Sequence, residues 1–210
     1  MCARRWDKLY PQVVSDLQVE LTHSGATFET IAFTDLDKPE ANRFQIYIFP
    51  NLFYVTPEKL AQVEKLKQQG KTLFFSYAPG YLTPSGRSLE SMNRLLGSAF
   101  KSFPGVFTKG KIMKTAQGIY YSTDGRWPRK QVQELFRKNG VNIYNTNTEP
   151  VIFAGGNFLT LHTAQGGKQS IKLPRKMKVS RCFPDTAEIG YTAEFEFNAP
   201  EKSTTVFYIR

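Results

Sequence analysis

The part of the sequence that most constrains the fold is residues 43–82, which predicts a strand, a loop, a capped helix and a second strand. Residues 46–49, IYIF, form a nearly continuous apolar run, which is typical of a strand buried on both faces of a parallel sheet. Thr56 is placed to cap the N-terminus of a helix whose first residue is a proline. Gly70 ends that helix, and residues 72–75 begin a second buried strand. The stretch therefore predicts a βαβ unit.

The neighbouring segments extend this layered pattern. Residues 10–23 predict an amphipathic helix and residues 27–33 predict a strand. A further helix is predicted beyond residue 82, with four apolar residues facing inward, namely Leu89, Met92, Leu95 and Leu96. Together these elements predict a flavodoxin-like, doubly wound α/β layer with a mostly parallel sheet. Such a layer should open with a central strand before its first helix, so we expect an unfilled edge or slot in the sheet.

The second half of the sequence has a different texture. Residues 130–138 predict a helix and residues 141–144 a strand. Short apolar segments separated by turns follow at 151–153, 158–163, 169–173, 194–197 and 204–209, which predict a small antiparallel β domain. We expect an α/β domain over residues 1–112, a connecting helix and strand over 113–147, and the β domain over 148–210.

The net charge of +10 raises the question of a nucleic-acid partner. The positive residues are spread over three diffuse groups, around residues 101–114, 126–138 and 168–181, with no helix-turn-helix, zinc-finger or RNP-type motif. A solvated basic surface is the simpler interpretation, and the sequence disfavours nucleic acid as a partner.

The sequence gives no sign of a membrane, a metal or a cofactor. No apolar run reaches the roughly 20 residues needed to cross a bilayer, and the first ten residues lack the apolar core of a signal peptide. We therefore expect a soluble chain that is cytoplasmic by default. The two cysteines, Cys2 and Cys182, stand in unrelated contexts and provide neither a disulfide framework nor metal-ligand spacing.

Two kinds of chemistry do not fit the sequence. A class I glutaminase needs a cysteine on a tight Gly-x-Cys-x-Gly turn with a histidine to activate it, whereas neither cysteine lies in such a turn and neither His23 nor His162 belongs to a His-x-Glu pair. A phosphate-binding Gly-x4-Gly-Lys pattern occurs at residues 105–111, but Ile112 stands where serine or threonine is required. A basic connecting loop is the better interpretation of that pattern.

Several segments carry a resemblance to a known family. They are SGATFE at residues 24–29, FTDL at 33–36, YIFPNLFYVTPE at 47–58 and GKTLFFSYAPGYL at 70–82. These segments resemble the glutamine-amidotransferase-like trimerisation domain of family-42 beta-galactosidases and related glycoside hydrolases. The sequence from GVNIYN (residues 140–145) through FAGGNFLTLHTAQGGKQSIKLPRK (153–176) is similar to the β domain that follows in those proteins.

The resemblance implies a role without catalysis. The catalytic carboxylates of that family belong to a TIM barrel, which these 210 residues do not encode. We therefore expect an accessory or oligomerisation module, with no catalytic residue of its own, that associates with itself or with a glycoside-hydrolase catalytic domain. The alternatives are part of a hydrolase that works only with a separate TIM-barrel chain, and a carbohydrate-binding module.

A candidate binding or interface site follows from the predicted layer. In open α/β sheets, ligands lie beyond the C-terminal ends of the strands. That edge would collect Asp35, Asn51, Tyr54, Tyr77 and Tyr81. Tyrosine is enriched at protein interfaces and can also stack on a sugar ring, so packing or subunit contact and carbohydrate contact both remain open, with the first favoured.

Overall fold

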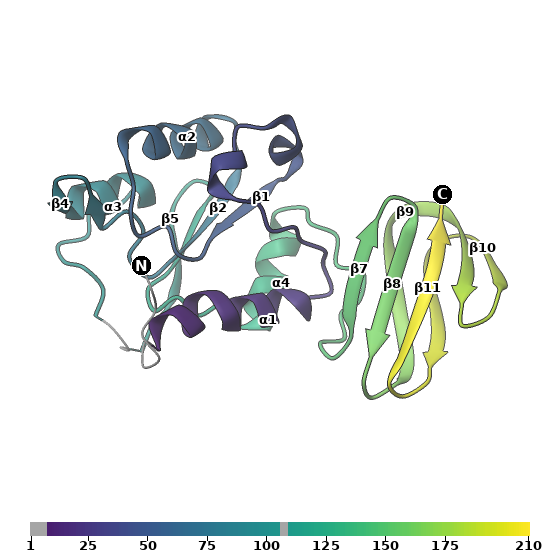
Figure 1. The fold of residues 1–210 in the computed structure, drawn as a ribbon. Coiled ribbons are helices and arrows are strands. Elements are labelled where there is room, and N and C mark those ends of the chain that lie inside the picture. Colours follow the sequence, from purple (N-terminus) through teal and green to yellow (C-terminus); the bar gives the residue numbers. More distant parts are fainter. Residues whose placement is uncertain (1–7, 106–108) are drawn as a thin grey trace. The chain divides into compact units, whose positions relative to one another are not determined.

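The chain forms two compact units in a computed structural model that describes residues 8–105 and 109–210 (Figure 1). The first unit contains residues 8–18 together with Thr30–Trp127. The second contains Val19–Glu29 together with Pro128–Arg210. The chain therefore passes from the first unit into the second, returns, and enters the second again.

The first unit is built on a four-stranded sheet in the order β1-β2-β6-β5. Strands β1, β2 and β6 run parallel to one another, and β5 runs antiparallel to β6. The strands are β1 (Ile46–Phe49), β2 (Thr72–Ser76), β5 (Ile112–Ala116) and β6 (Ile119–Ser122). The predicted strands at residues 46–49 and 72–75 are confirmed, and the sheet is mixed rather than wholly parallel.

Two helices with side-chain caps connect and cover these strands. Helix α2 (Pro57–Gln68) begins where the Thr56 hydroxyl accepts a hydrogen bond from the backbone N–H of Lys59 at 3.4 Å. Helix α3 (Leu89–Leu96) begins in the same way, with the Ser88 hydroxyl accepting from the N–H of Ser91 at 3.0 Å. Both helices match the sequence prediction, because their caps and apolar faces are local signals.

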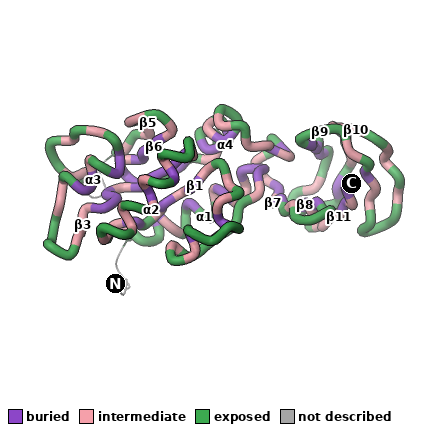
Figure 2. The backbone as a smooth tube through the Cα atoms, turned by 90° about the horizontal axis from the view of Figure 1, so that it is seen from above, coloured by how far each residue is buried: buried purple, intermediate pink, exposed green. Residues whose placement is uncertain are grey.

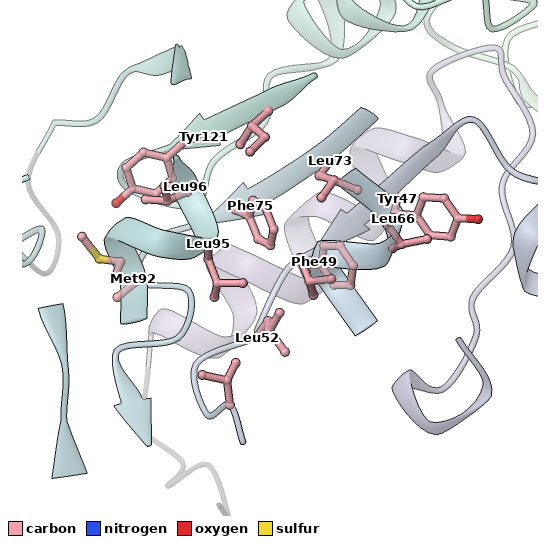
Figure 3. Close-up of a cluster of buried hydrophobic side chains, with 14 of the residues drawn as sticks. Tyr47, Phe49, Leu52, Leu66, Leu73, Phe75, Met92, Leu95, Leu96 and Tyr121 are labelled. Carbon is pink, nitrogen blue, oxygen red and sulfur yellow. The ribbon is translucent and has the colours of Figure 1, made fainter. Parts of the chain in front are cut away.

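The hydrophobic core of the first unit lies between this helical layer and one face of the sheet (Figure 3). The rings of Phe49 and Phe75, on adjacent strands, stack with their centroids 5.1 Å apart. Leu66 from α2 and Leu95 and Leu96 from α3 join the same buried cluster. The burial of these side chains is the main stabilising contribution to the unit.

A helical segment near the N-terminus consists of η1 (Pro11–Ser15), with π-helical hydrogen bonding, and α1 (Asp16–Thr22). It confirms the helix predicted for residues 10–23. The side chain of Val13 packs against Gly125, where a β-carbon would come within 2.4 Å of a Val13 methyl carbon. Shorter elements complete the unit: η2 (Phe33–Asp35), η3 (Pro39–Arg43), β3 (Leu82–Thr83) and β4 (Gly86–Arg87).

Two predicted strands are absent and one strand pair was not predicted. Residues 27–32 belong to no helix or strand, and residues 28–32 are exposed. Residues 141–144 make single backbone hydrogen bonds to different segments, such as Tyr144 N–H to the Gly25 carbonyl at 2.7 Å, instead of a ladder. The pair β5 and β6 lies in a stretch for which the sequence predicts neither strand. A strand exists only where a partner strand completes its hydrogen bonds, and partners are not visible in local sequence.

The second unit contains one helix and an antiparallel sheet in the order β10-β9-β11-β8-β7. Its elements are α4 (Arg129–Lys138), β7 (Val151–Gly155), β8 (Phe158–Thr163), β9 (Gly167–Phe183), β10 (Ala187–Ala199) and β11 (Ser203–Ile209). The predicted antiparallel β domain is confirmed, although β9 and β10 are much longer than the segments expected at residues 169–173 and 194–197. Buried residues alternate with more exposed ones along β8, so one face of the sheet is a core and the other is open. Figure 2 colours the whole backbone by burial.

Candidate functional site

The loops that follow β1 and β2 are joined by backbone hydrogen bonds. The N–H of Gly80 donates to the Leu52 carbonyl at 2.7 Å, and the N–H of Leu82 donates to the Phe53 carbonyl at 2.9 Å. The N–H of Val55 returns a bond to the Leu82 carbonyl at 2.9 Å. The two loops therefore form one rigid structure, which carries all the predicted site residues except Asp35.

Tyr77 occupies the bend at the end of β2, with a φ of 57°, in the left-handed region that favours glycine. Its N–H donates to the Ser122 carbonyl at 2.8 Å, and its carbonyl accepts a hydrogen bond from the hydroxyl of Tyr121. Burial, followed by the nearby Tyr81 hydroxyl, raises the pKa of Tyr77. Tyr77 and Tyr81 are both half-buried, at the two ends of one short loop.

Aromatic neighbours account for both side chains. The ring of Tyr77 meets Phe53 edge-on at a centroid distance of 6.0 Å, and the ring of Tyr81 meets Phe103 edge-on at 5.8 Å. Edge-to-face contacts of this kind are favourable packing arrangements. Packing is therefore the simplest role of both tyrosines.

Tyr54 has a different environment. It is 46% exposed, and the ammonium group of Lys59 lies 5.5 Å from the centroid of its ring and equally far from that of Phe33. Lys59 thus joins Tyr54 to the η2 turn, which also carries Asp35. The Asp35 carboxylate pairs with Lys38 at 2.9 Å.

Asn51 is exposed, and its backbone carbonyl accepts from the N–H of Phe53 at 2.8 Å. The predicted residues therefore fall into two groups, a packed pair of tyrosines and an exposed group around Tyr54. Over residues 8–105 and 109–210, no contact makes these side chains converge on one ligand site.

The groups considered for catalysis lie elsewhere. His23 Nδ1 lies 2.7 Å from the Glu149 carbonyl, and His162 Nδ1 lies 2.9 Å from the Thr204 hydroxyl, so both rings are held by local hydrogen bonds. Cys182 is exposed at the end of β9, and Cys2 lies outside the described residues. Part of the phosphate-loop-like pattern, residues 106–108, also lies outside them.

Over residues 8–105 and 109–210, no three histidine, cysteine or acidic side chains are grouped so that they could hold a metal ion. Within those ranges, no helix combines the length and apolar character that a membrane span needs.

A buried polar cluster closes the C-terminal end of β6. The Asp124 carboxylate accepts hydrogen bonds from the N–H of Gly110 at 3.2 Å and the N–H of Arg126 at 3.1 Å. Gln12 donates to the Asp124 carbonyl at 2.5 Å and accepts from the Arg126 guanidinium at 3.2 Å. These bonds fix the turn after β6 and the helical segment η1, which makes the cluster a structural one. The sequence Ser-Thr-Asp-Gly at residues 122–125 is typical of a turn and is the sequence signal for this cluster.

The open face of the sheet in the second unit carries a group of aromatic side chains that sequence reasoning missed. We call it the aromatic face and define it as Phe153, Phe158, Phe183 and Tyr208. Strand register places them together. Phe158 on β8 lies opposite Tyr208 on β11. Val206 on β11 lies between Phe183 of β9 and Thr160 of β8, and Thr160 in turn lies opposite Phe153 of β7. Phe153, Phe158 and Phe183 are 61%, 50% and 52% exposed.

Polar groups border the aromatic face. Asn157 donates to the Tyr208 hydroxyl at 3.4 Å, and the Arg210 guanidinium lies 5.8 Å from the centroid of the Tyr208 ring. Contiguous exposed apolar side chains in a soluble protein mark interaction sites more often than isolated ones do. The aromatic face is therefore a candidate interaction surface of the second unit.

Comparison with known proteins gives matches among solved structures. A beta-galactosidase from Bacillus circulans sp. alkalophilus is similar over 96% of this chain and 38% of its own, with a TM-score of 0.65 and 12% identity. A catalytic mutant of Gan42B, a GH42 beta-galactosidase from G. stearothermophilus, is similar over 99% of this chain and 38% of its own, with a TM-score of 0.61 and 16% identity. The beta-galactosidase from Rahnella sp. R3 is similar over 98% of this chain and 38% of its own, with a TM-score of 0.60 and 12% identity.

No protein-family model and no curated protein matches the chain. The chain thus has the fold of a part of GH42 beta-galactosidases and spans about 38% of their length. This confirms the expected similarity to a part of family-42 beta-galactosidases, with a mixed α/β sheet in the first unit and an antiparallel sheet in the second.

Proposed function

We propose that the chain is a non-catalytic assembly module of glycoside-hydrolase ancestry, which associates with itself or with a TIM-barrel catalytic domain. The observation that carries the proposal is an asymmetry in the structural matches. They cover 96–99% of this chain but only 38% of the beta-galactosidases. In this proposal the catalytic carboxylates belong to the part of those proteins that has no counterpart here.

The finer organisation forms part of the same proposal. The expected boundaries are residues 1–112 for a flavodoxin-like, glutamine-amidotransferase-like layer, 113–147 for a connection and 148–210 for the small β domain, and β5 and β6 extend the sheet of the layer to residue 122. The parallel pairing of β1 with β2 through α2 supports a doubly wound layer.

Exposed apolar side chains support association. Tyr54 in the first unit and the aromatic face in the second leave large rings in water, an arrangement that a partner surface would relieve. Tyrosine and phenylalanine are enriched at the centres of interfaces, where they fill pockets of a partner.

Light scattering over a range of chain concentrations tests self-association. We expect a mass above that of one chain, and we expect Tyr54→Ala to lower it. Tyr10→Ala is the matched control, because Tyr10 has the same exposed fraction as Tyr54, 46%, and lies outside the predicted site. A single-chain mass at every concentration, together with no complex with a GH42 catalytic barrel, would contradict the proposal.

The hydrolase alternative needs a second chain for activity. Hydrolysis of a nitrophenyl galactoside should then be absent with this chain alone and should increase when the chain is added to a GH42 catalytic barrel. If adding the chain does not change the rate of hydrolysis by the barrel, assembly has no catalytic consequence and this alternative is disfavoured.

The aromatic face favours carbohydrate binding as a second candidate function. Exposed rings beside Asn157 and Arg210 could offer both stacking surfaces and hydrogen-bond donors to a sugar. A glycan array separates the two candidates. Glycan binding that is lost in Phe153→Ala and Phe158→Ala, with an unchanged mass in light scattering, would rank carbohydrate binding first.

A further inference from the structure

The free edge of β1 is the feature of the first unit that its own fold leaves without a partner. The N–H of Thr72 in β2 donates to the Gln45 carbonyl at 2.9 Å. Backbone groups of successive residues point to opposite edges of a strand, so those of Ile46 and Ile48 point away from β2. Among the described residues, no strand pairs with that edge and no backbone hydrogen bond reaches it. Both isoleucines are half-buried.

The opposite edge of the same sheet is protected against pairing. Strand β5 carries exposed Lys114, follows exposed Lys111 directly, and has a shift of register between Lys114 and Ala116. Charged residues, especially lysine, and bulges are the devices by which proteins keep an edge strand unpaired. Residues 46–49 contain no charge, no proline and no register shift. The sheet therefore has one edge suited to remain in water and one suited to accept a strand.

We infer that the free edge of β1 receives an extended apolar strand from the catalytic chain with which the module assembles, and this inference rests on the proposed assembly function. The added strand would continue the parallel order of β1, β2 and β6. Strands within parallel sheets are apolar on both faces, so the strand should be uncharged and rich in valine, isoleucine, phenylalanine or tyrosine.

A strand of the catalytic chain fits this edge better than a second copy does. Stable interfaces between separate proteins bury about 1,200 Å² or more, which an edge of four residues supplies only in part. A strand tethered to a partner that is already docked through other surfaces binds at a high effective concentration and needs little area of its own. The beta-galactosidases that share this fold contain such additional polypeptide, because the chain covers 38% of them.

A synthetic peptide tests the edge directly. The probe is the capped sequence of residues 71–77, KTLFFSY, because β2 already pairs with β1 in parallel in the fold. We expect the peptide to slow amide hydrogen exchange at residues 46–49 by roughly tenfold or more. A peptide with proline in place of its central phenylalanine lacks the needed N–H and should give no protection.

Edge-blocking variants make the test specific. Ile48→Lys and Ile46→Lys should weaken peptide binding at least tenfold, whereas Met113→Lys on the protected edge strand β5 should leave it unchanged. Two lysine variants are used because one could disturb the half-buried face, and unchanged exchange elsewhere in the sheet shows that each is folded.

Two results would overturn the inference. One is equal protection by the proline peptide, or none by either peptide. The other is protection of residues 46–49 in the free chain that increases with chain concentration, which would assign the edge to a second copy. Association of the wild-type chain in light scattering, with no protection of residues 46–49 by either peptide, would reject the strand and leave the assembly function standing.

Discussion

The hydroxyl of Thr163, at the end of β8, donates a hydrogen bond of 2.5 Å to the carboxylate of Glu149 in the loop before β7. The other carboxylate oxygen accepts from the N–H of Ala164 at 2.6 Å and the N–H of Gln165 at 3.2 Å. Burial opposes ionisation, but these hydrogen bonds and the charge of His23 outweigh it, and the pKa of Glu149 lies below its ordinary value. One ionised side chain thus holds the turn between β8 and β9.

We expect Glu149→Gln to lower the free energy of unfolding by about 1–2 kcal/mol at pH 7, because an amide replaces a charged acceptor. A carboxylate with a lowered pKa stabilises the fold above its unfolded pKa of about 4.3, and that stabilisation is lost as the pH falls through the folded pKa. Urea unfolding at pH 7 and near pH 3 should therefore show a difference between wild type and variant that shrinks in acid. Glu134→Gln, exposed on α4, is the control; an equal effect there would contradict the assignment.

Alanine substitutions at Gly25 and Gly70 distinguish the free-energy cost of backbone strain from that of steric overlap. Both have positive φ, 75° and 71°, but a β-carbon on Gly25 would lie 1.8 Å from the Asn145 carbonyl oxygen, whereas one on Gly70 would meet nothing within 4 Å. Gly70→Ala should cost about 1–2 kcal/mol of unfolding free energy from the left-handed backbone alone. Gly25→Ala should cost more than about 3 kcal/mol, because the loop that carries Asn145 must also move. Urea unfolding measures both, and similar costs would show that the loop yields easily.

Local signals explain how much of the fold could be predicted. Thr56, Gly70 and the apolar runs on either side of the helix each act within a few residues, and the βαβ unit follows from them alone. Residues 27–32 have strand-like composition but no ladder partner, and the run Ile119–Tyr121 becomes part of β6 only because β2 lies beside it. Pairing across long sequence separations cannot be read from local patterns, so the sequence predicts a strand at residues 27–33 and none at 119–122.

The same reasoning applies to the candidate site. Tyr77 and Tyr81 were expected at one edge of the sheet and do lie together, because a short loop joins them. The aromatic face was missed because its residues come from β7, β8, β9 and β11, and only the register of those strands makes them neighbours.

Tyr121 should matter at alkaline pH. Its hydroxyl bonds the Tyr77 carbonyl, and burial, followed by the nearby Tyr77 hydroxyl, raises its pKa above the ordinary value. A tyrosine with a raised folded pKa contributes stability below its unfolded pKa of about 10, and this contribution is lost as the pH rises through the folded pKa. Tyr121→Phe should cost about 1–2 kcal/mol at pH 7 and should flatten the loss of stability above pH 10. Tyr120→Phe, half-buried on the same strand, is the control for urea unfolding at pH 7 and pH 11. A steep alkaline loss that persists in Tyr121→Phe would assign the effect to another group.

The aromatic face should contribute little to the stability of the sheet that carries it. Leu159 and Phe158 are successive residues of β8, but Leu159 is fully buried whereas Phe158 is 50% exposed. Leu159→Ala should cost about 2–5 kcal/mol of unfolding free energy, because it removes buried methyl groups and leaves a cavity. Phe158→Ala and Phe153→Ala should each cost less than about 1 kcal/mol, since their rings are largely in water. Urea unfolding gives these values, with calorimetry as a second measurement.

Costs above about 2 kcal/mol at Phe158 and Phe153 would mean that the aromatic face is part of the fold's own packing, and association or sugar binding would then need another surface. Small costs would leave those rings available to a partner, because contiguous exposed apolar patches mark interaction sites in soluble proteins.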